Sequence, residues 1–459
     1  MQVSPKSYTL VVGLGRSGLS MARFLAARGY IVKATDIDPA AANNAEALNR
    51  LGIETQIGFH DQETFNQADA IVASPGIPLD MPFLQKAASL GIPLLGDLDI
   101  FIRYNRTPMV AITGTNGKTT VTTLVRDILL ASGIPTFMGG NIGTPLVEYL
   151  MSPDPARVVV AEISSFQLDL ARHFAPETAV LLNLAPDHLD RYESMADYAR
   201  SKWSIFKNQA RHHTAIINAG ISDAFCAKPD LAARVYAFSA NPDHTITQGA
   251  IITDHAIDLI LPEKFTDRTL HIDCRNLKNL PGTHNRENIA AAALASLSAG
   301  ADTRAIAAAV ASFTPLPHRM AFVASINGIQ FYNDSKATNT DAVIRALAYF
   351  KTRIVLILGG RKKDTDFTLL LPAVKDKEIQ IIAMGEAAQD IARVFSRVCS
   401  VTCVSTMKQA VKTAFDAARP ADVILLSPAC ASFDMYDNYG ARGEDFIACV
   451  TELEHIYHG

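Results

Sequence analysis

The chain has 459 residues, of which 49% are apolar and 19% charged, so it is long enough for two or three domains that each bury a core. Forty-two basic residues against forty-six acidic ones give a formal net charge of -4. This balance lacks the basic excess of nucleic-acid-binding proteins, and we expect no nucleic-acid partner. The six cysteines are scattered without a C-x-x-C pair, which excludes an obvious zinc site or disulfide framework and fits a reducing compartment.

Membrane and secretion signals are missing from the sequence as well. No apolar run approaches the about 20 residues that a membrane span needs. The first residues lead directly into a strand and a glycine loop, without the apolar segment of a secretory leader. We therefore expect a cytoplasmic protein with no membrane span.

Apolar runs followed by helical patterns occur in three successive α/β units. They predict a Rossmann-like domain over residues 1–97, a central P-loop domain over 98–313 and a second Rossmann-like domain over 314–459. Short alternating segments between Asn241 and Gly282 predict an antiparallel flap on the central domain. The two prolines of SFTPLPHRM disfavour a continuous helix and place the second boundary near Thr314.

The first unit begins with a strand at 9–12, a glycine loop at Gly13–Gly18 and a helix over 20–29. The next strand ends at Asp36. This order is typical of sites that bind a nucleotide diphosphate, where the acidic residue reaches a sugar hydroxyl. By itself the pattern favours NAD, and a glycine turn needed only for helix packing is the plain alternative.

The central unit carries the most informative motif, TGTNGKTT at Thr113–Thr120, between a strand and a helix. Its glycines let backbone amides turn toward an anion, Lys118 can neutralise phosphate charge, and the Thr119 hydroxyl can ligate magnesium. The strict P-loop pattern requires glycine where Ile112 stands, so this is a shortened variant. The ATP-binding residues predicted here are Gly114, Thr115, Asn116, Gly117, Lys118, Thr119 and Thr120.

Two further strands of this unit end in polar residues. Glu162 ends RVVVAE, and Asp187 and His188 follow TAVLLN, at the edge where open α/β sheets bind ligands. Carboxylates there suit a hard cation, whereas a loop-capping Glu162 and a packed His188 are the alternatives. Lys202 lies on a predicted helix, where a lone lysine is ordinarily solvated. Asn285 and Asn288 precede another predicted helix and are candidates for its cap.

The last unit contains predicted strands at 353–360, 379–385, 401–405 and 422–429, which form a small doubly wound sheet. Polar residues follow several of these strands, and we expect their loops to converge on one cleft. The basic segment Arg361-Lys362-Lys363 is typical of an anion site at a strand end, and a run of solvated surface charges is the alternative. The residues concerned are Asp334, Lys336, Arg361, Lys362, Lys363, Ser432 and Tyr439.

The ordered set GLGRSG, GTNGKTT, EISSFQL, NLAPDHLDRY, GTHNREN, NDSKATN and SPACASFD, spread over the whole chain, resembles the Mur ligases. The resemblance implies an ATP-dependent ligase of peptidoglycan precursor synthesis. The amino-terminal domain would bind the UDP end of the substrate, the central domain ATP, and the carboxyl-terminal domain an amino acid. The NDSKATN and SPACASFD motifs imply UDP-N-acetylmuramoyl-L-alanine and D-glutamate as substrates, and we expect a monomer.

The resemblance also implies roles for single residues. Lys118, Thr119 and Glu162 match phosphate and first-magnesium positions. His188 and Lys202 match positions around a second magnesium ion, with Lys202 as a carbamate. Positions near the adenine nucleotide are Asn285, Asn288, Arg319 and Asp334. Positions near D-glutamate are Lys336, Thr338, Lys363, Ser432 and Tyr439. Positions along the UDP substrate are Gly15, Ser17, Asp36, Ser74, Asn141 and His188.

Two departures from the family pattern bear on the D-glutamate residues. The loop reads GGRKKD, which leaves open whether Lys362 or Lys363 meets the amino acid, and Tyr439 stands where phenylalanine is familiar.

The competing hypotheses are sister ligases with another acceptor, an NAD-dependent dehydrogenase, and a nucleotide-binding protein without turnover. The first glycine loop argues against a folate-extending ligase. The chain also lacks a DNPR-like segment of the kind that the diaminopimelate-adding ligase uses, which argues against that enzyme. A dehydrogenase leaves GTNGKTT unexplained.

Overall fold

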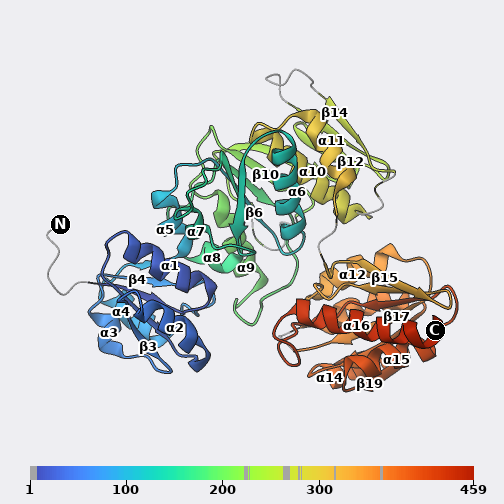
Figure 1. Ribbon diagram of the computed structural model, residues 1–459. Coiled ribbons are helices and arrows are strands. Elements are labelled where there is room, and N and C mark those ends of the chain that lie inside the picture. The colour runs from blue at the N-terminus through green and yellow to red at the C-terminus, as the bar shows by residue number, and fades with distance from the viewer. Residues whose placement is uncertain are drawn as a thin grey trace. The chain divides into compact units, whose positions relative to one another are not determined.

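The computed structural model describes residues 8–221, 226, 228–261, 269–275, 277, 280, 282–314, 317–361 and 365–458 (Figure 1). Its strands form three sheets, one in each predicted α/β unit. By contact density the chain divides into two compact units. Unit 1 comprises Met1–Leu184, Ala196–Asn276 and Arg286–Ser312, and unit 2 comprises Ala185–Met195, Leu277–Asn285 and Phe313–Gly459. No helix among the described residues is long and apolar enough to cross a membrane.

The amino-terminal sheet is parallel, with strand order β3-β2-β1-β4-β5. The apolar strand at its centre, β1, is almost wholly buried because helices cover both faces, as expected for a doubly wound sheet (Figure 1). Its strands are β1 (Thr9–Val12), β2 (Val32–Asp36), β3 (Glu54–Ile57), β4 (Ala70–Ala73) and β5 (Leu94–Leu95). Its helices are α1 (Arg16–Ala27), α2 (Ala42–Asn49), α3 (Gln62–Asn66) and α4 (Pro82–Ser89).

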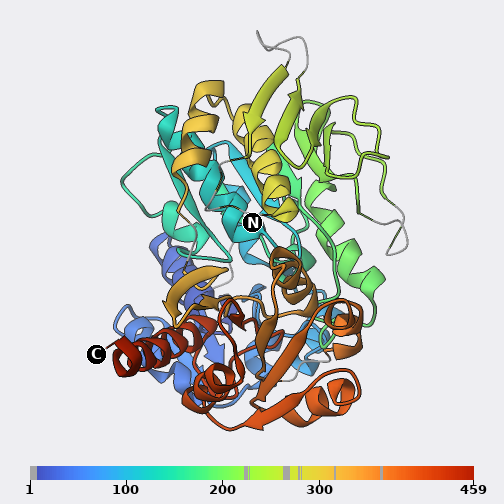
Figure 2. The same ribbon diagram turned by 90° about the vertical axis from the view of Figure 1, so that its right-hand side faces the viewer.

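Helix α5 (Asp97–Tyr104) leads into the central sheet, whose order is β14-β13-β12-β11-β10-β9-β6-β8-β7. The part from β11 to β7 is parallel. Its strands are β6 (Met109–Thr113), β7 (Thr136–Gly140), β8 (Val158–Glu162), β9 (Thr178–Leu181), β10 (Thr214–Asn218) and β11 (Arg234–Ser239). The accompanying helices are α6 (Lys118–Ala131), α7 (Leu146–Tyr149), α8 (Ser165–Asp169), α9 (Met195–Trp203), α10 (Thr283–Ser298) and α11 (Thr303–Ser312). Figure 2 shows α10 and α11, in yellow and gold, beside the teal α6.

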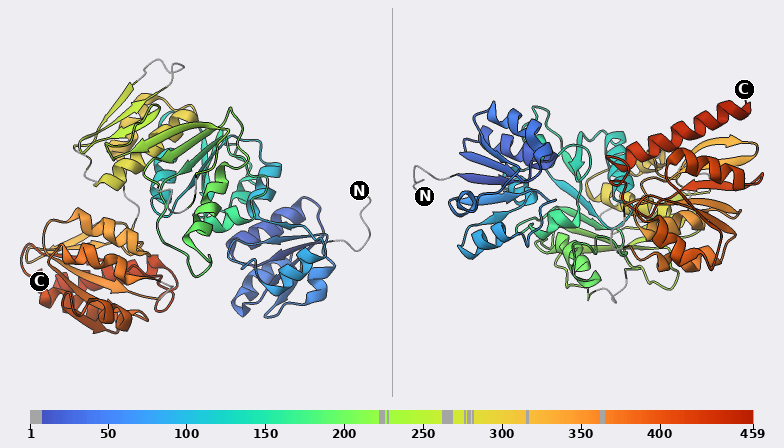
Figure 3. Two further views of the ribbon diagram at one scale, coloured as in Figure 1. Left: turned by 180° about the vertical axis from the view of Figure 1, so that it is seen from behind. Right: turned by 90° about the horizontal axis from the view of Figure 1, so that it is seen from below.

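The predicted antiparallel flap is confirmed. Strands β12 (Gly249–Ile252), β13 (Ala256–Ile260) and β14 (Thr269–Asp273) pair antiparallel with one another and extend the edge of the central sheet (Figure 3). The flap joins the sheet through β12, which pairs parallel with β11. Gly249 makes this junction possible, because a side chain there would overlap the Ala237 carbonyl oxygen.

The third sheet, in unit 2, has the order β15-β16-β20-β17-β18-β19. It is parallel except for β15, which pairs antiparallel with β16. Its strands are β15 (Ala321–Ile326), β16 (Ile329–Asn333), β17 (Ile354–Gly359), β18 (Ile379–Met384), β19 (Val401–Val404) and β20 (Val423–Leu426). Its helices are α12 (Thr340–Tyr349), α13 (Leu371–Lys375), α14 (Ala388–Phe395), α15 (Met407–Ala417) and α16 (Tyr439–His458), of which α16 runs along β15 and β16 (Figure 3).

One local prediction was wrong. Asn285 and Asn288 were expected to precede a helix and cap it, but α10 begins at Thr283, so both asparagines lie inside its first two turns. Asn288 is buried at 5% exposure and therefore faces the fold rather than the helix end. The three-domain division at residues 97 and 313 agrees with the positions of the three sheets and stays a prediction.

Candidate functional site

The loop between β6 and α6 has the shape that a phosphate requires. Gly117 at its tip has φ 86°, a left-handed conformation that favours glycine. A side chain there would also overlap the Asn288 carboxamide oxygen of α10. Lys118 and Thr119 begin α6, so backbone N–H groups and the positive end of the helix dipole meet at this loop.

A neighbouring strand holds this loop in place. Asn183, just after β9, accepts hydrogen bonds from the backbone N–H groups of Thr115 (3.1 Å, to its carbonyl) and Asn116 (2.9 Å, to its side chain). Its side-chain amide donates in return to the Asn116 carbonyl at 3.0 Å. Lys118 Nζ lies over the loop and donates to the carbonyls of Gly114 and Thr115, each at 2.9 Å. The loop is thus preorganised with its ammonium group at the centre.

Glu162, at the end of β8 next to β6, fits the role of a magnesium ligand. It is buried at 2% exposure, and its Oε1 accepts a hydrogen bond from Asn141 Nδ2 at 2.7 Å. Its Oε2 is buried and has no hydrogen-bond partner among the described residues. An unsatisfied buried carboxylate oxygen is costly unless a cation or donor is bound there, and Mg²⁺ prefers such oxygen ligands. Within the described chain, no three His, Cys, Asp or Glu side chains gather into a metal cluster.

Lys202 is not the solvated surface lysine that its sequence context suggests. It is only 1% exposed, on α9, and its Nζ lies 4.7 Å from the ring centre of Tyr198. The Tyr198 hydroxyl in turn lies 3.1 Å from Thr115 Oγ1 in the phosphate loop. A buried lysine beside the loop needs a compensating partner or a chemical change that removes its positive charge.

The first glycine loop, between β1 and α1, is also tightly built. Gly18 lies so close to the Gly13 carbonyl oxygen that a methyl group would overlap it. Ser74 Oγ donates to the same carbonyl at 2.7 Å. Asp36 Oδ2 accepts the Leu14 N–H at 2.6 Å, so part of the predicted sugar-binding carboxylate already holds the loop. Gly15 is exposed and Ser17 partly exposed at the loop surface.

A contact within unit 1 links this loop to the central sheet. Arg16 Nη2 donates to the Gly143 carbonyl at 2.6 Å, in the loop that also carries Asn141. Asn141 therefore stands between the first glycine loop and Glu162.

In unit 2, Asp334 follows β16 and is buried at 6% exposure. It accepts hydrogen bonds from the Met320 N–H at 3.2 Å and from Ser427 Oγ at 3.0 Å. Burial raises the pKa of its carboxyl to about 7, although the charge of Arg319 and these hydrogen bonds oppose the shift. Asp334 can therefore exchange a proton near neutral pH.

Of the D-glutamate residues predicted in unit 2, Lys336, Thr338 and Ser432 lie on two loops that one arginine joins, and Tyr439 begins α16. Arg442, near the start of α16, is 2% exposed and donates to Ser335 Oγ (3.0 Å), the Ser335 carbonyl (2.8 Å) and the carbonyls of Cys430 and Ala431 (3.0 and 3.3 Å). Burial lowers the pKa of its guanidinium to about 10. On these loops Lys336 Nζ donates to the Tyr439 hydroxyl at 3.2 Å, and Ser432 is buried at 2% exposure.

Unusual backbone conformations mark the same motifs. His188, His318, Met320 and Ala429 have positive φ angles of 57°, 62°, 45° and 58°. Such conformations cost energy and concentrate at functional sites. His188 also lies 3.8 Å from Asp187 Oδ2, and that oxygen accepts a hydrogen bond from Asn339 at 3.0 Å. The DHLDRY segment thus groups with the NDSKATN loop in unit 2.

The remaining predicted residues fall in different places. Thr119 and Thr120 are buried at the start of α6, and Thr338 is partly buried in the NDSKATN loop. Lys362 and Lys363 lie outside the described residues. Asn285 belongs to unit 2, and Asn288 to unit 1. The predicted residues that the structure describes therefore fall mainly into three groups, at the first glycine loop, around the phosphate loop, and on the loops near Arg442.

Sequence reasoning missed two of the residues that organise these sets. Asn183 was part of a recognised motif, but only its hydrogen bonds to Thr115 and Asn116 show that it holds the phosphate loop. Arg442 was missed because a single arginine at a helix start carries no signal of burial.

Comparisons with known proteins identify relatives along the whole chain. Family models match three consecutive parts of the chain: a Mur ligase MurD-like N-terminal domain at residues 7–96, a Mur ligase middle domain at 112–296 and a Mur ligase glutamate ligase domain at 318–430. Two relatives named UDP-N-acetylmuramoylalanine–D-glutamate ligase, from Desulfosudis oleivorans and Desulfatibacillum aliphaticivorans, are each 42% identical. The alignments cover 98% and 97% of this chain, and 97% and 98% of the relatives.

Solved structures share the fold at low sequence identity. A pseudomurein peptide ligase type C from Methanothermus fervidus aligns with a TM-score of 0.59 at 19% identity, covering 97% of this chain and 100% of its own. UDP-N-acetylmuramate–alanine ligase MurC from Thermotoga maritima aligns with a TM-score of 0.57 at 16% identity, covering 97% and 99%. Because two relatives are 42% identical to this chain over nearly its whole length, the chain belongs to the Mur ligase family.

Proposed function

We propose that the protein is an ATP-dependent ligase that joins D-glutamate to UDP-N-acetylmuramoyl-L-alanine in peptidoglycan synthesis. The observation that carries the proposal is the full-length match to relatives named for this activity, combined with a GKT loop braced by Asn183 next to the buried Glu162. A dehydrogenase would leave that second loop without a purpose. Such an enzyme works in the cytoplasm, where ATP and nucleotide sugars are available.

The chemistry follows from the substrates. A carboxylate is a poor electrophile, so the alanyl carboxylate is first phosphorylated by the γ-phosphoryl group of ATP. The amine of D-glutamate then attacks the acyl phosphate, and phosphate leaves from the tetrahedral intermediate. Lys118 and the amides at the start of α6 hold and neutralise the phosphates, which is chiefly positioning and electrostatic stabilisation.

Thr119, Glu162, His188 and Lys202 are the proposed residues around two magnesium ions. Magnesium neutralises charge on the transferring phosphoryl group. Carbamylation of Lys202 would turn a cation into an oxygen ligand, and the burial of Lys202 beside Tyr198 supports this. A test is phosphate release after removal of carbon dioxide: activity should fall and return with added bicarbonate, whereas an unchanged rate refutes the carbamate.

The division of labour is also proposed by domain. Residues 1–97 would bind the UDP end through Gly15, Ser17, Asp36 and Ser74, with Asn141 and His188 from the central region. Residues 98–313 would bind ATP through the phosphate loop and Asn288, assisted by Asn285, Arg319 and Asp334. Residues 314–459 would bind D-glutamate through Lys336, Thr338, Lys363, Ser432 and Tyr439. The monomeric state stays a prediction.

The decisive experiment is phosphate release from ATP with UDP-N-acetylmuramoyl-L-alanine and magnesium, comparing D-glutamate with L-glutamate, L-alanine and diaminopimelate. Phosphate and ligated product with D-glutamate alone are expected. Turnover with another amino acid would support the ligase chemistry but refute D-glutamate as the amino acid that is added. Nicotinamide absorbance that changes with the substrate would favour the dehydrogenase instead.

A further inference from the structure

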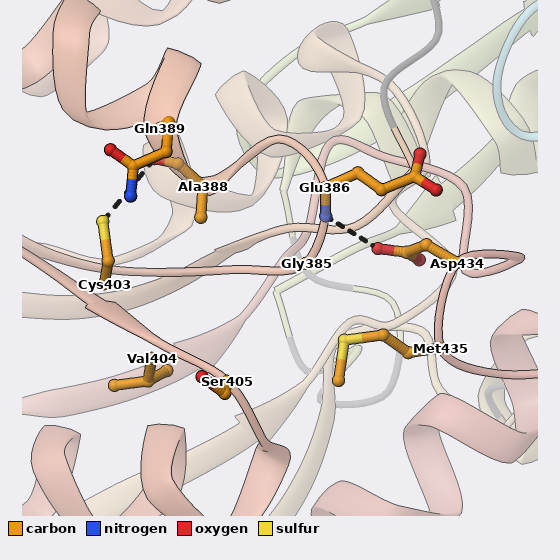
Figure 4. A pocket seen from close by; sticks show the side chains of 9 residues that line it. All are labelled: Gly385, Glu386, Ala388, Gln389, Cys403, Val404, Ser405, Asp434 and Met435. Atoms are coloured by element: carbon orange, nitrogen blue, oxygen red, sulfur yellow. Dashed lines mark hydrogen bonds between the residues drawn. The ribbon is translucent and has the colours of Figure 1, made fainter.

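The turn between β18 and α14, residues Gly385–Ala387, contacts two neighbouring loops of unit 2 at once. Asp434 Oδ2, two residues after Ser432, accepts the Glu386 N–H at 3.0 Å (Figure 4). On the other side, the Ala387 N–H donates to the Gly360 carbonyl at 3.0 Å, where β17 has just ended. One short turn therefore ties the loop that carries Ser432 to the end of β17.

The turn leaves little freedom for either neighbour. Gly385 has φ 72°, and a side chain on it would overlap Asp434 Oδ2 and come within 2.8 Å of Gly360 Cα. Asp434 and Gly360 thus approach one backbone position from two sides. The missing side chain at Gly385 lets the Asp434 carboxylate and the Gly360 backbone both come close to the turn.

An ion pair closes the same arrangement from the solvent side. Arg361 Nη2 lies 3.4 Å from Glu386 Oε1, and the Arg361 N–H donates to the Ala431 carbonyl at 2.9 Å. Both side chains are about half exposed, at 48% and 51%, so the pair contributes little to overall stability. Arg361 follows the end of β17, and its backbone N–H contacts Ala431, the residue before Ser432. The ion pair therefore acts locally, on the position of the Ser432 loop.

A pocket of about 460 Å³ lies beside this arrangement. Figure 4 shows Glu386, Asp434, Cys403 and Met435 among its lining residues, with the Glu386 N–H bonded to the Asp434 carboxylate. Because this pocket lies beside Asp434, fewer packing contacts hold the outer part of the Ser432 loop, and the hydrogen bond to the Glu386 N–H is one of the contacts that fix it there.

We propose that Arg361, Glu386 and Asp434 form an acceptor clamp, a set of positioning residues that fixes Ser432 relative to the end of β17 and thereby sets the affinity for the incoming amino acid. This inference rests on the proposed function of Ser432 in D-glutamate binding. The clamp itself does not touch the substrate. It acts on the acceptor loop alone, so the affinities for ATP and the UDP substrate should be independent of it.

The test is steady-state kinetics of the full-length enzyme with each of the three substrates varied in turn. Asp434→Ala removes a charge-assisted hydrogen bond, so we expect the KM for D-glutamate to rise about tenfold, equivalent to about 1.4 kcal/mol. Arg361→Glu should act in the same direction by placing two carboxylates together. The KM for ATP should change by less than about twofold in both variants.

Charge reversal separates positioning from a general structural role. The double variant Arg361→Glu with Glu386→Arg restores an opposite pair, and the KM for D-glutamate should return toward the wild-type value. The matched control is Glu452→Ala, which breaks the ion pair between Lys408 Nζ and Glu452 Oε1 (2.6 Å) in the same unit. The Glu452 side chain is 53% exposed, about as much as that of Glu386. The control should leave all three KM values unchanged.

Hydrogen exchange gives a readout that does not depend on turnover. Protection of residues 429–436 should fall in Asp434→Ala and stay unchanged in Glu452→Ala. Equal shifts of all three KM values, failure of the double variant to recover, or unchanged exchange in this loop would overturn the clamp. If the wild type prefers another amino acid, the proposed function fails, and the clamp is judged on the KM for that amino acid.

Discussion

The two glycine loops of unit 1 share a backbone design and differ in what surrounds them. Each loop follows a parallel strand and leads into a helix. Each also contains glycines at which an added methyl group would overlap neighbouring atoms. In the first loop, the nearby carboxylate of Asp36 accepts the Leu14 N–H and so belongs partly to the scaffold. In the second, Lys118 lies over the loop and Glu162 keeps a buried oxygen without a partner in the described structure.

On the proposed function, both loop shapes would hold a phosphate, and the groups on the neighbouring strands would decide whether that phosphate is only bound or also transferred. In the first loop, Asp36 and Ser74 bond the backbone of the loop, and we expect a role in binding. In the second, Lys118 also bonds loop carbonyls, but Glu162 Oε2 beside the loop has no hydrogen-bond partner in the described structure, and we expect a role in chemistry. Changes to the second should therefore affect the rate, and changes to the first should affect affinity and stability.

Lys118→Ala should have the largest effect. Removing the positive charge at the phosphate loop should lower kcat for phosphate release by about 1,000-fold or more, because charge on the transferring group loses its stabilisation. The thermal midpoint should change little. Lys412→Ala, an exposed lysine paired with Asp416 on α15, is the control and should behave as wild type. A Lys118→Ala enzyme with more than a tenth of the wild-type rate would refute the expectation that the second loop determines the rate of phosphate release.

Glu162→Gln should have the next largest effect. The substitution keeps the size of the side chain and removes the charge, so we expect kcat to fall about 100-fold and the magnesium midpoint to rise about tenfold. A magnesium titration of phosphate release measures both. An unchanged magnesium midpoint would show that the unsatisfied oxygen has another partner.

Sequence reasoning was strongest where the structure is local. The strand, loop and helix order around Gly13–Gly18 and Thr113–Thr120, and the flap, could be predicted because they depend on neighbouring residues. Asn288 was misassigned because α10 begins a turn and a half earlier, and its contact with Gly117 joins segments distant in the chain. The burial of Lys202 and Arg442 was missed for the same reason, since burial depends on which elements pack together.

Gly18→Ala tests the first loop. The added methyl group would overlap the Gly13 carbonyl and press on Ser74 Oγ, so α1 must move away from the strand end. We expect a loss of about 1–3 kcal/mol, a thermal midpoint lower by a few degrees, and a rise of about tenfold in the KM for the UDP substrate with kcat nearly retained. Gly76→Ala, where a methyl group meets nothing within 4 Å, is the control. A fall in kcat without a change in KM would contradict a binding role for this loop.

The smallest expected effect concerns Asp97, at the start of the helix that connects the two sheets of unit 1. Its Oδ2 accepts a hydrogen bond from Gln167 Nε2 at 2.7 Å, and Gln167 also caps α8, just after Glu162. Burial raises the pKa of Asp97 to about 6 from 3.8, against the hydrogen bonds of Gln167 and Leu98. The connection between the two glycine loops therefore includes a carboxyl that binds a proton more tightly in the folded state.

The raised pKa of Asp97 sets the direction in which pH changes the stability of the folded protein. A raised pKa favours the folded protein when the carboxyl is protonated, so this contribution is fully present below about pH 3.8 and is lost as the pH rises through about 6. Between pH 7.5 and 5, the thermal midpoint of the wild type should rise relative to Asp97→Asn by about 2–4 °C, because asparagine does not titrate. Parallel pH profiles for the two proteins would mean that Asp97 is solvated and that the two loops are joined by packing alone.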